Sequence, residues 1–323
     1  MMLSVKNLHV SFRSQGKKIY AVQGVSFDQK EGEKLGIVGE SGSGKSALVK
    51  AFIQLIPRET AQIDEGEVWF NGKNLAALSE HELQKVRGRE IGMIFQDPMT
   101  SLNPTQKIGV QIGEGILRHF PSLSSSTVRK QVIDLLAKVG IPDPERRFSE
   151  FPHTLSGGLR QRILIAIALA AEPKLLIADE PTTALDVTVQ AQILELMKQF
   201  ETSRSTILIS HDLSVVAGFC DRILVMYAGK IVEDAPVEEL FAHPKHPYTQ
   251  KLLKALPRLD LEKSEMLQPI MGSPPDLRSP STHCAFCPRC PQAMNICRKE
   301  SPPLFDLGQE HKVACWLYDK RCS

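Results

Sequence analysis

Residues 39–46 read GESGSGKS, a run whose glycines, lysine and serine could together hold a phosphate group. Glycines at 39, 42 and 44 allow backbone angles that other residues avoid, so successive N–H groups can turn toward one anion. The run follows an apolar segment, KLGIVG, and precedes the helical spacing of SALVKAFIQLI, which is the context that a phosphate loop requires. A serine- and glycine-rich surface turn would need neither that context nor the lysine.

This loop predicts a nucleoside-triphosphate site. Lys45 would reach the β- and γ-phosphates, the hydroxyl of Ser46 would ligate Mg²⁺, and the helix beginning near Lys45 would add its positive end. The residues expected to surround the nucleotide here are Gly39, Glu40, Ser41, Gly42, Ser43, Gly44, Lys45, Ser46 and Ala47.

A second chemical feature is the acidic pair that ends the apolar run KLLIADE at Asp179 and Glu180. Asp179 is placed to hold Mg²⁺ through water, and Glu180 can act as the base that polarises an attacking water. Such a pair can also be an ordinary N-cap and first-turn acid of the next helix. The phosphate loop upstream favours the catalytic interpretation.

Two more polar residues follow apolar runs. His211 comes after STILIS and Gln96 comes after IGMIF. His211 is predicted to contact the γ-phosphate and help hold the water, the alternative being an ordinary strand-end histidine. Gln96 is predicted to sense Mg²⁺ and the water, and with Lys45 and Glu180 these two complete the expected catalytic set.

The stretch LSGGLRQR, residues 155–162, places a serine and two glycines at the start of a helix. It predicts a second anion-binding helix N-terminus in the same chain. One nucleotide cannot easily use both anion sites of one subunit. Two subunits arranged head to tail could, because each would supply its LSGG stretch to the other's phosphate loop.

The elements that must position these motifs follow from periodicity. LSVKNLHVSF alternates apolar and polar residues as a half-buried strand does. Apolar strands and helices then alternate, which predicts a mostly parallel sheet covered on both faces. A polar, helical region from about Asp97 to Glu150 interrupts that alternation, and prolines at 257, 269, 274, 275 and 280 indicate a linker.

Bulk composition limits the function classes. The chain has 323 residues, enough for two domains, and 39 basic against 37 acidic residues, which argues against binding nucleic acid through bulk charge. The longest apolar stretch, Ile163–Ala171, has nine residues, short of the ~20 that cross a bilayer. No signal peptide is evident, so a soluble, intracellular protein with reduced cysteines is expected.

Taken in order, GESGSGKS, Gln96, LSGGLRQR, LLIADE, TALD and His211 resemble the motifs of the ATP-binding cassette ATPases, over roughly residues 2–255. The resemblance implies an α/β P-loop NTPase fold that binds ATP and Mg²⁺. That fold has a RecA-like core with a mostly parallel sheet, an antiparallel β subdomain and a helical lobe inserted at about residues 97–165.

In that family two nucleotide-binding domains enclose two ATP molecules. The resemblance implies that Ser156, Gly157 and Gly158 of one domain face the γ-phosphate held by the other, and that Asp186 of the ALD stretch couples the two sites. It also places Phe12 where an aromatic ring stacks on adenine. Tyr20 is the alternative ring, and either ring could instead be core packing.

Further segments, FQDPMTSLNP, YAGKIVE, HPYTQKLLKALP, PRCP, PPL and VACWL, resemble the oligopeptide/dipeptide (and nickel) importer branch. This implies a peripheral ATPase on the cytoplasmic side of the cell membrane, paired with a paralogous ATPase and bound to two permease subunits near residues 97–104. An extracytoplasmic peptide-binding protein would deliver the cargo. Nickel or another small cargo remains an alternative, as does a soluble cassette ATPase outside transport.

The resemblance divides the chain into a nucleotide-binding domain, 1–255, and a small cysteine-rich metal-binding region, 256–323. Cysteines in the second part suit a [4Fe–4S] cluster or a Cys₄ zinc site, as a structural staple or a redox sensor. Cys287 is a possible substitute ligand, Cys322 a possible further one, and Cys220 is expected in the core. The implied ligands are Cys284, Cys290, Cys297 and Cys315.

Overall fold

The computed structural model describes the chain except for residues 15, 184, 201–203, 256–269, 281 and 320–323. The described residues form two compact units. The first joins residues 1–77 to residues 210–323, and the second is residues 78–209. The predicted domain boundary at 255/256 lies at the edge of a stretch outside the described residues, and it stays a prediction.

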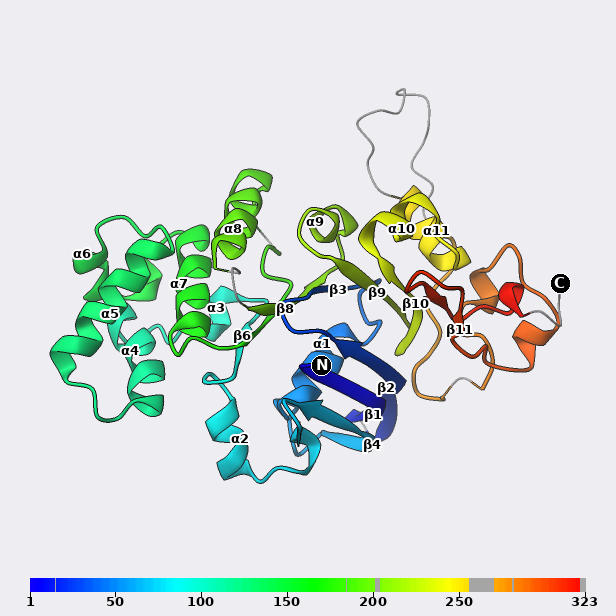
Figure 1. Cartoon of the computed structure of the whole chain (residues 1–323), viewed down its shortest axis with the longest axis horizontal. Coiled ribbons are helices and arrows are strands. Elements are labelled where there is room, and N and C mark those ends of the chain that lie inside the picture. The colour runs from blue at the N-terminus through cyan, green and yellow to red at the C-terminus, as the bar shows by residue number, and fades with distance from the viewer. Residues whose placement is uncertain (15, 184, 201–203, 256–269, 281, 320–323) are drawn as a thin grey trace. The chain divides into compact units, whose positions relative to one another are not determined.

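An antiparallel sheet opens the first unit (Figure 1), with strands in the order β2-β1-β4-β5. Its first strand follows the predicted alternation, with Leu3 and Val5 buried and Ser4 and Lys6 more exposed. The pairing is antiparallel throughout, which agrees with the predicted β subdomain. The strands are β1 (Leu3–Ser14), β2 (Lys17–Gln29), β4 (Ala61–Phe70) and β5 (Lys73–Asn74).

The other strands of the first unit run in the order β11-β12-β10-β9-β3. β3 pairs in parallel with β9, whereas the remaining pairs are antiparallel. The chain's C-terminal part therefore adds two short strands to the edge of β10. The strands are β3 (Lys34–Val38), β9 (Arg222–Tyr227), β10 (Lys230–Pro236), β11 (Phe305–Asp306) and β12 (Lys312–Val313).

The helices of the first unit are short. α1 carries the helical spacing predicted after the phosphate loop and buries Leu48, Val49 and Phe52. Among the described residues after 270, the only helical structure is single 3₁₀ turns, at Cys287–Arg289, Ile296–Arg298 and Trp316–Tyr318. The helices are α1 (Lys45–Phe52), α9 (Leu213–Ala217), α10 (Val237–Ala242) and α11 (Pro247–Lys254), with a 3₁₀ turn at Leu75–Ala77.

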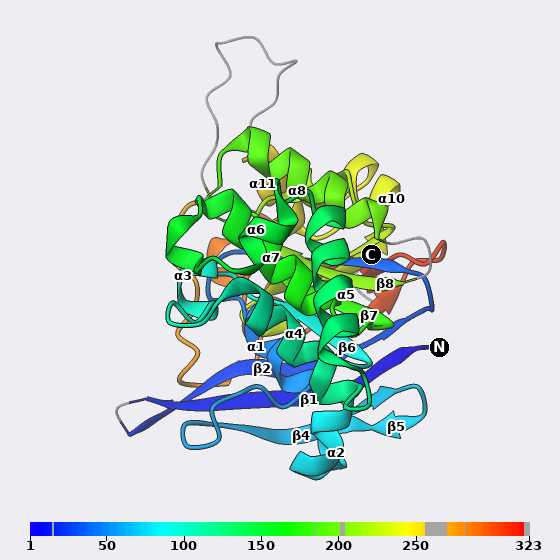
Figure 2. The ribbon, with the colours of Figure 1, turned by 90° about the vertical axis from the view of Figure 1, so that its left-hand side faces the viewer.

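The second unit combines a parallel strand ladder with helices. Its three strands are β6 (Ile91–Ile94), β7 (Leu175–Asp179) and β8 (Ser205–Ser210), all paired in parallel. Helices α4, α5 and α7 pack against one another (Figure 2). The helices are α2 (Glu80–Val86), α3 (Pro98–Ser101), α4 (Ile108–His119), α5 (Ser125–Lys138), α6 (Pro144–Phe148), α7 (Gly157–Leu169) and α8 (Val187–Gln199), with a 3₁₀ turn at Pro152–Thr154.

The predicted strands LSVKNLHVSF, KLGIVG, KLLIAD and STILIS are all present, and residues 97–165 are mainly helical as predicted. The expectation of a mostly parallel sheet needs a correction. The strands beside the motifs are parallel, but the C-terminal part adds antiparallel strands, so the sheet is mixed. No helix within the described ranges is long and apolar enough to cross a membrane.

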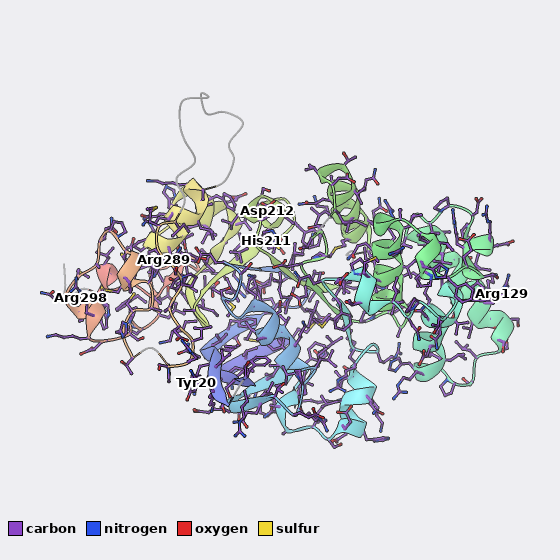
Figure 3. The ribbon with its side chains drawn as sticks, turned by 180° about the vertical axis from the view of Figure 1, so that it is seen from behind. Tyr20, Arg129, His211, Asp212, Arg289 and Arg298 are labelled. Atoms are coloured by element: carbon purple, nitrogen blue, oxygen red, sulfur yellow. The ribbon has the colours of Figure 1, made fainter. Side chains whose placement is uncertain are left out.

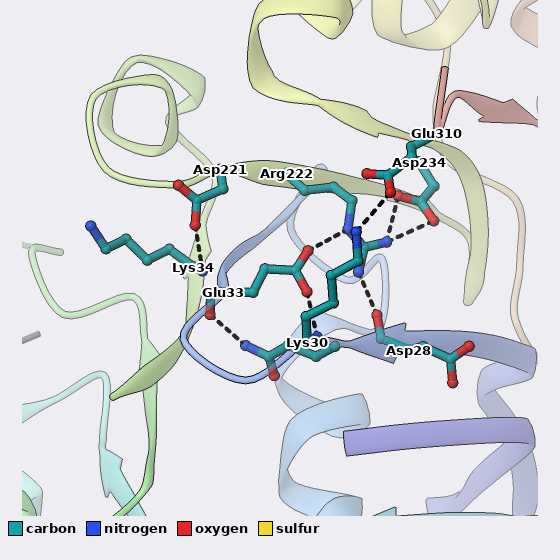
Figure 4. Close-up of polar contacts among 9 residues, drawn as sticks. Asp28, Lys30, Glu33, Lys34, Asp221, Arg222, Asp234 and Glu310 are labelled. Carbon is teal, nitrogen blue, oxygen red and sulfur yellow. Dashed lines mark hydrogen bonds and ion pairs between the residues drawn. The ribbon is translucent and has the colours of Figure 1, made fainter. Parts of the chain in front are cut away.

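A buried arginine ties the first unit together at the turn between β2 and β3 (Figure 4). Arg222 donates from Nε to Glu33 Oε1 at 2.7 Å and from Nη1 to both carboxylate oxygens of Asp234, at 2.8 and 3.0 Å. It also donates to the backbone carbonyl of Asp28. The Arg222 side chain is only 15% exposed, so one cation joins the starts of β9 and β3 to β10.

We expect Arg222→Met to lower the free energy of unfolding by about 3–5 kcal/mol, because it leaves the buried carboxylate of Asp234 and the half-buried carboxylate of Glu33 without this cation. Urea unfolding followed by circular dichroism measures this. Arg278→Met is the matched control, since Arg278 pairs with Asp276 on the surface and exposed pairs contribute little. Equal stability of the Arg222 variant and the wild type would contradict the assigned role.

Candidate functional site

The phosphate loop joins β3 to α1 with backbone angles that favour glycine. Gly42 has φ 79° and Gly44 has φ 101°, both left-handed. Space is the second constraint: a Cβ on Gly39 would lie 2.2 Å from the carbonyl oxygen of Met226, and one on Gly44 would lie 2.2 Å from that of Ala21. Any larger residue would push the loop away from its supporting strands.

Lys45, the first residue of α1, is folded back over this loop. Its Nζ donates to the carbonyl oxygens of Gly39 at 2.8 Å and Glu40 at 3.1 Å, and its side chain is buried. The ammonium group therefore lies against the loop that is predicted to hold the phosphates. Ser46 is half-buried beside it on the first turn of α1.

The candidate adenine-stacking rings lie on the hairpin of β1 and β2. Phe12 pairs with Ile19 and Tyr20 pairs with Ser11, and both aromatic side chains are half-buried. Tyr20 (Figure 3) donates its backbone N–H to the carbonyl of Leu277 at 2.8 Å. Both rings therefore stay open as candidates, and the preference for Phe12 remains a prediction.

His211 is exposed and directly precedes α9 in the first unit. Its neighbour Asp212 caps that helix by accepting a hydrogen bond from the backbone N–H of Ser214 at 2.8 Å (Figure 3). The cap sets the path of the chain at this point. The predicted contact of His211 with the γ-phosphate stays a prediction.

In the second unit, Asp179 and Glu180 end β7. Asp179 is fully buried, and Glu180 has a left-handed φ of 50°. The Glu180 carboxylate oxygen Oε2 accepts from Gln96 Nε2 at 3.1 Å and from the hydroxyl of Thr183 at 2.9 Å. Gln96 and Glu180, which sequence reasoning assigned to one task, are thus brought together.

This geometry also bears on the alternative in which the acidic pair caps a helix. The next helix, α8, begins at Val187, and its N-cap is Asp186, whose side chain accepts from the backbone N–H of Val189 at 2.9 Å. Asp179 and Glu180 therefore lie before that cap and do not serve it. The predicted coupling role of Asp186 stays a prediction beside its observed capping role.

The LSGG stretch begins α7. Ser156 is the N-cap residue, and Ser156 and Gly157 are both exposed. Gly158 packs closely on α8, because a Cβ there would lie 3.0 Å from Val189 Cγ1. The start of this 13-residue helix therefore faces outward in its own unit. An anion from another molecule could reach it.

The predicted ligand cysteines lie in the C-terminal part of the first unit. Cys287 and Cys297 form a small apolar cluster with Trp316, against which Cys284 also packs. Burial raises the pKa of the Cys284 thiol to about 11 and that of the Cys315 thiol to about 12, while backbone N–H groups that hydrogen-bond to these sulfurs act in the opposite direction.

The arrangement of these cysteines does not support the predicted metal-binding region. Over the described residues, no group of three or more His, Cys, Asp or Glu side chains is arranged so that it could hold a metal ion. Cys287 is as close to this cluster as Cys297, Cys322 lies outside the described residues, and Cys220 is buried in the core as predicted.

Two residues of the site were missed by sequence reasoning. Thr183 lies three positions after Glu180, and a hydroxyl at that spacing could have predicted the hydrogen bond to Glu180. Arg289 contacts Glu40 of the phosphate loop from 249 positions away, and no local pattern indicates it.

The phosphate loop and His211 belong to the first unit. Gln96, Glu180 and the LSGG stretch belong to the second.

Comparison with known proteins identifies the class. A family model described as "ABC transporter" matches residues 22–183, and one described as "Oligopeptide/dipeptide transporter, C-terminal region" matches residues 232–297. The chain is 52% identical to the dipeptide transport ATP-binding protein DppD of Bacillus subtilis (strain 168), over 100% of this chain and 96% of that protein. It is 53% identical to the oligopeptide transport ATP-binding protein OppD of the same strain, over 98% and 88%.

A solved structure agrees with the fold. The dimeric structure of MJ0796, a bacterial ABC transporter cassette, matches with a TM-score of 0.66 at 30% identity, over 73% of this chain and 99% of that one. The chain therefore belongs to the ABC transporter family. It has the P-loop cassette fold and is an ATPase of that family.

We expect Thr183→Val to lower the ATPase kcat about tenfold, because Glu180 loses the hydroxyl donor of Thr183 and a hydrogen bond to a charged group contributes about 1.5 kcal/mol or more. ATP affinity should not change. Thr183→Ser, which keeps the hydroxyl, is the control. A Val variant as fast as wild type, or a Ser variant as slow as Val, would refute the orienting role.

Proposed function

We propose that this chain is the ATP-hydrolysing subunit of an ABC importer that powers uptake of dipeptides or oligopeptides. The observation that carries the proposal is the pairing of a cassette match with a match to the oligopeptide/dipeptide transporter C-terminal region in one chain. Relatives named for dipeptide and oligopeptide transport align with nearly all of it.

In this proposal each predicted site residue has a separate role in the reaction. The phosphate loop binds the ATP phosphates through its amides and Lys45, and Ser46 with Asp179 holds Mg²⁺. Glu180 takes a proton from the attacking water as the water oxygen bonds to the γ-phosphorus, the bond from that phosphorus to the β,γ-bridging oxygen breaks, and ADP leaves. Gln96 and His211 position the water and the γ-phosphate.

We propose further that two such sites form between two cassettes, with Ser156, Gly157 and Gly158 of one facing the nucleotide of the other. The exposed N-terminus of α7 supports this, since its amides can receive an anion from another molecule. A solved cassette of the same family is described as dimeric. The partner in this importer is a paralogous cassette.

Two permease subunits complete the assembly on the cytoplasmic side of the cell membrane, and an extracytoplasmic binding protein delivers the peptide to them. The docking surface we propose is residues 97–104. Asp97 accepts from the backbone N–H of Met99 at 2.8 Å and so caps the short helix α3, which leaves the Met99 side chain 63% exposed. An exposed apolar side chain on a capped turn suits a permease helix.

For the C-terminal part, we propose that Cys284, Cys290, Cys297 and Cys315 ligate a [4Fe–4S] cluster, with a zinc ion as the alternative. Such a group would supply structural stapling to a segment with few regular elements. Two of these residues, Cys284 and Cys297, lie in or against one small apolar cluster. Backbone N–H groups hydrogen-bond to the sulfurs of Cys284, Cys290 and Cys315, which also supports the proposal. Loading requires the thiols to lose protons and the sulfurs to approach one another.

Glu180→Gln tests the proposed function. In cells that depend on this chain for peptide uptake, we expect the variant to abolish ATP-driven uptake of a labelled dipeptide. The purified variant should still bind ATP and should accumulate as a closed dimer, because the base is lost while the phosphate contacts remain. Unchanged steady-state hydrolysis would contradict the role of Glu180. Loss of nickel uptake with unchanged peptide uptake would favour the other cargo.

The metal proposal is tested by measuring iron, acid-labile sulfide and zinc in protein purified without air. About four irons with matching sulfide per chain are expected for a cubane cluster. One zinc without sulfide would assign a structural zinc site instead. If the anaerobically purified protein contains neither iron nor zinc, the proposal is wrong. Cys290→Ser is the control in which one proposed ligand is lost.

A further inference from the structure

The C-terminal part is packed onto the first unit through Phe286, which is 1% exposed. Its ring lies 5.2 Å from the ring of Tyr227 in an edge-on arrangement, 5.4 Å from that of Tyr248 and 5.8 Å from that of His246. Tyr227 ends β9 and Tyr248 lies on α11. Phe286 therefore fixes the segment that follows it against the elements around the phosphate loop.

Three residues later, Arg289 reaches the phosphate loop itself. Its Nη1 donates to Glu40 Oε2 at 2.8 Å and its Nη2 to Glu40 Oε1 at 3.0 Å, a bidentate pair. Nη1 also donates to the hydroxyl of Tyr227 at 3.2 Å. The Arg289 side chain is 5% exposed, and its Nε and Nη2 donate to the backbone carbonyls of Met271 and Ile270, each at 3.0 Å.

Glu40 is the second residue of the phosphate loop, and its backbone is held as well. The N–H of Glu40 donates to the hydroxyl of Tyr248 at 2.9 Å, and its carbonyl accepts from Lys45 Nζ at 3.1 Å. The position of the Glu40 main chain thus affects the lysine that is predicted to bind phosphate. The Glu40 side chain also places a negative charge beside a loop that must receive a polyanion.

We propose that Arg289 is a positioning residue for the nucleotide site, which neutralises Glu40 and holds the phosphate loop in its binding geometry. The inference rests on the proposed function, in which this loop binds ATP. The interaction is charge-assisted, bidentate and largely shielded from water, so replacing it by solvent leaves Glu40 to repel the incoming phosphates. The segment that bears the cysteines thereby contributes directly to ATP binding.

This mechanism makes a charge-specific prediction for the full-length chain. We expect Arg289→Gln to weaken Mg²⁺–ATP binding about tenfold in calorimetric titrations, with a smaller loss for ADP and the smallest for AMP, because the repulsion grows with ligand charge. Adding Glu40→Gln to this variant should recover most of the affinity, since it removes the uncompensated charge. A purely structural role of Arg289 would not be rescued in this way.

Arg298→Gln is the matched control, because Arg298 lies in the same C-terminal part (Figure 3) but is exposed. It should bind ATP as the wild type does. Arg289→Lys keeps the charge but loses the bidentate geometry, so we expect it to bind ATP with an intermediate affinity. This variant also replaces Arg289→Gln in the test if Arg289→Gln does not fold. Wild-type affinity in both Arg289 variants, or no recovery in the double variant, would overturn the inference. Absence of ATP binding by the wild type would overturn the proposed function, and this inference with it.

Discussion

The proposed nucleotide site depends on the close approach of the phosphate loop to its supporting strands. The loop can turn its amides toward an anion only if Gly39 and Gly44 lie directly on the carbonyls of Met226 and Ala21, where no Cβ fits. This contact ties the loop to β9 and β2, which are themselves joined through Arg222. In the proposed site, phosphate binding and the packing of the first unit therefore rest on the same backbone contacts.

The second unit holds the carboxylate that we propose as the base of the reaction. Glu180 sits at the end of a buried strand, and its Oε2 is oriented by donors from Gln96 and Thr183. The same unit presents the exposed N-terminus of α7. In the proposed head-to-tail pair of cassettes, this helix start would receive the anion bound by the other cassette.

The C-terminal part has little regular structure, yet it is joined closely to the cassette. β12 extends the edge of β10, Phe286 inserts between aromatic rings, and Arg289 reaches the phosphate loop. His311 adds a buried contact to Glu233 at 2.8 Å. These contacts explain how a segment with a small apolar core of its own keeps a definite position, and why its cysteines are buried enough for their thiol pKa values to rise.

The sequence by itself determined the local chemistry: the phosphate loop, the acidic strand end, the helix start at Ser156 and the alternating strand β1. Each depends on residue types at short spacing, and local backbone preferences act over that range. Tertiary structure alone decided that the C-terminal strands run antiparallel, because strands of two residues carry no periodic signal. It also decided the pairing of Arg289 with Glu40 across 249 positions, because local backbone preferences do not act over such a separation and long-range packing, including that of Phe286, brings the two residues together.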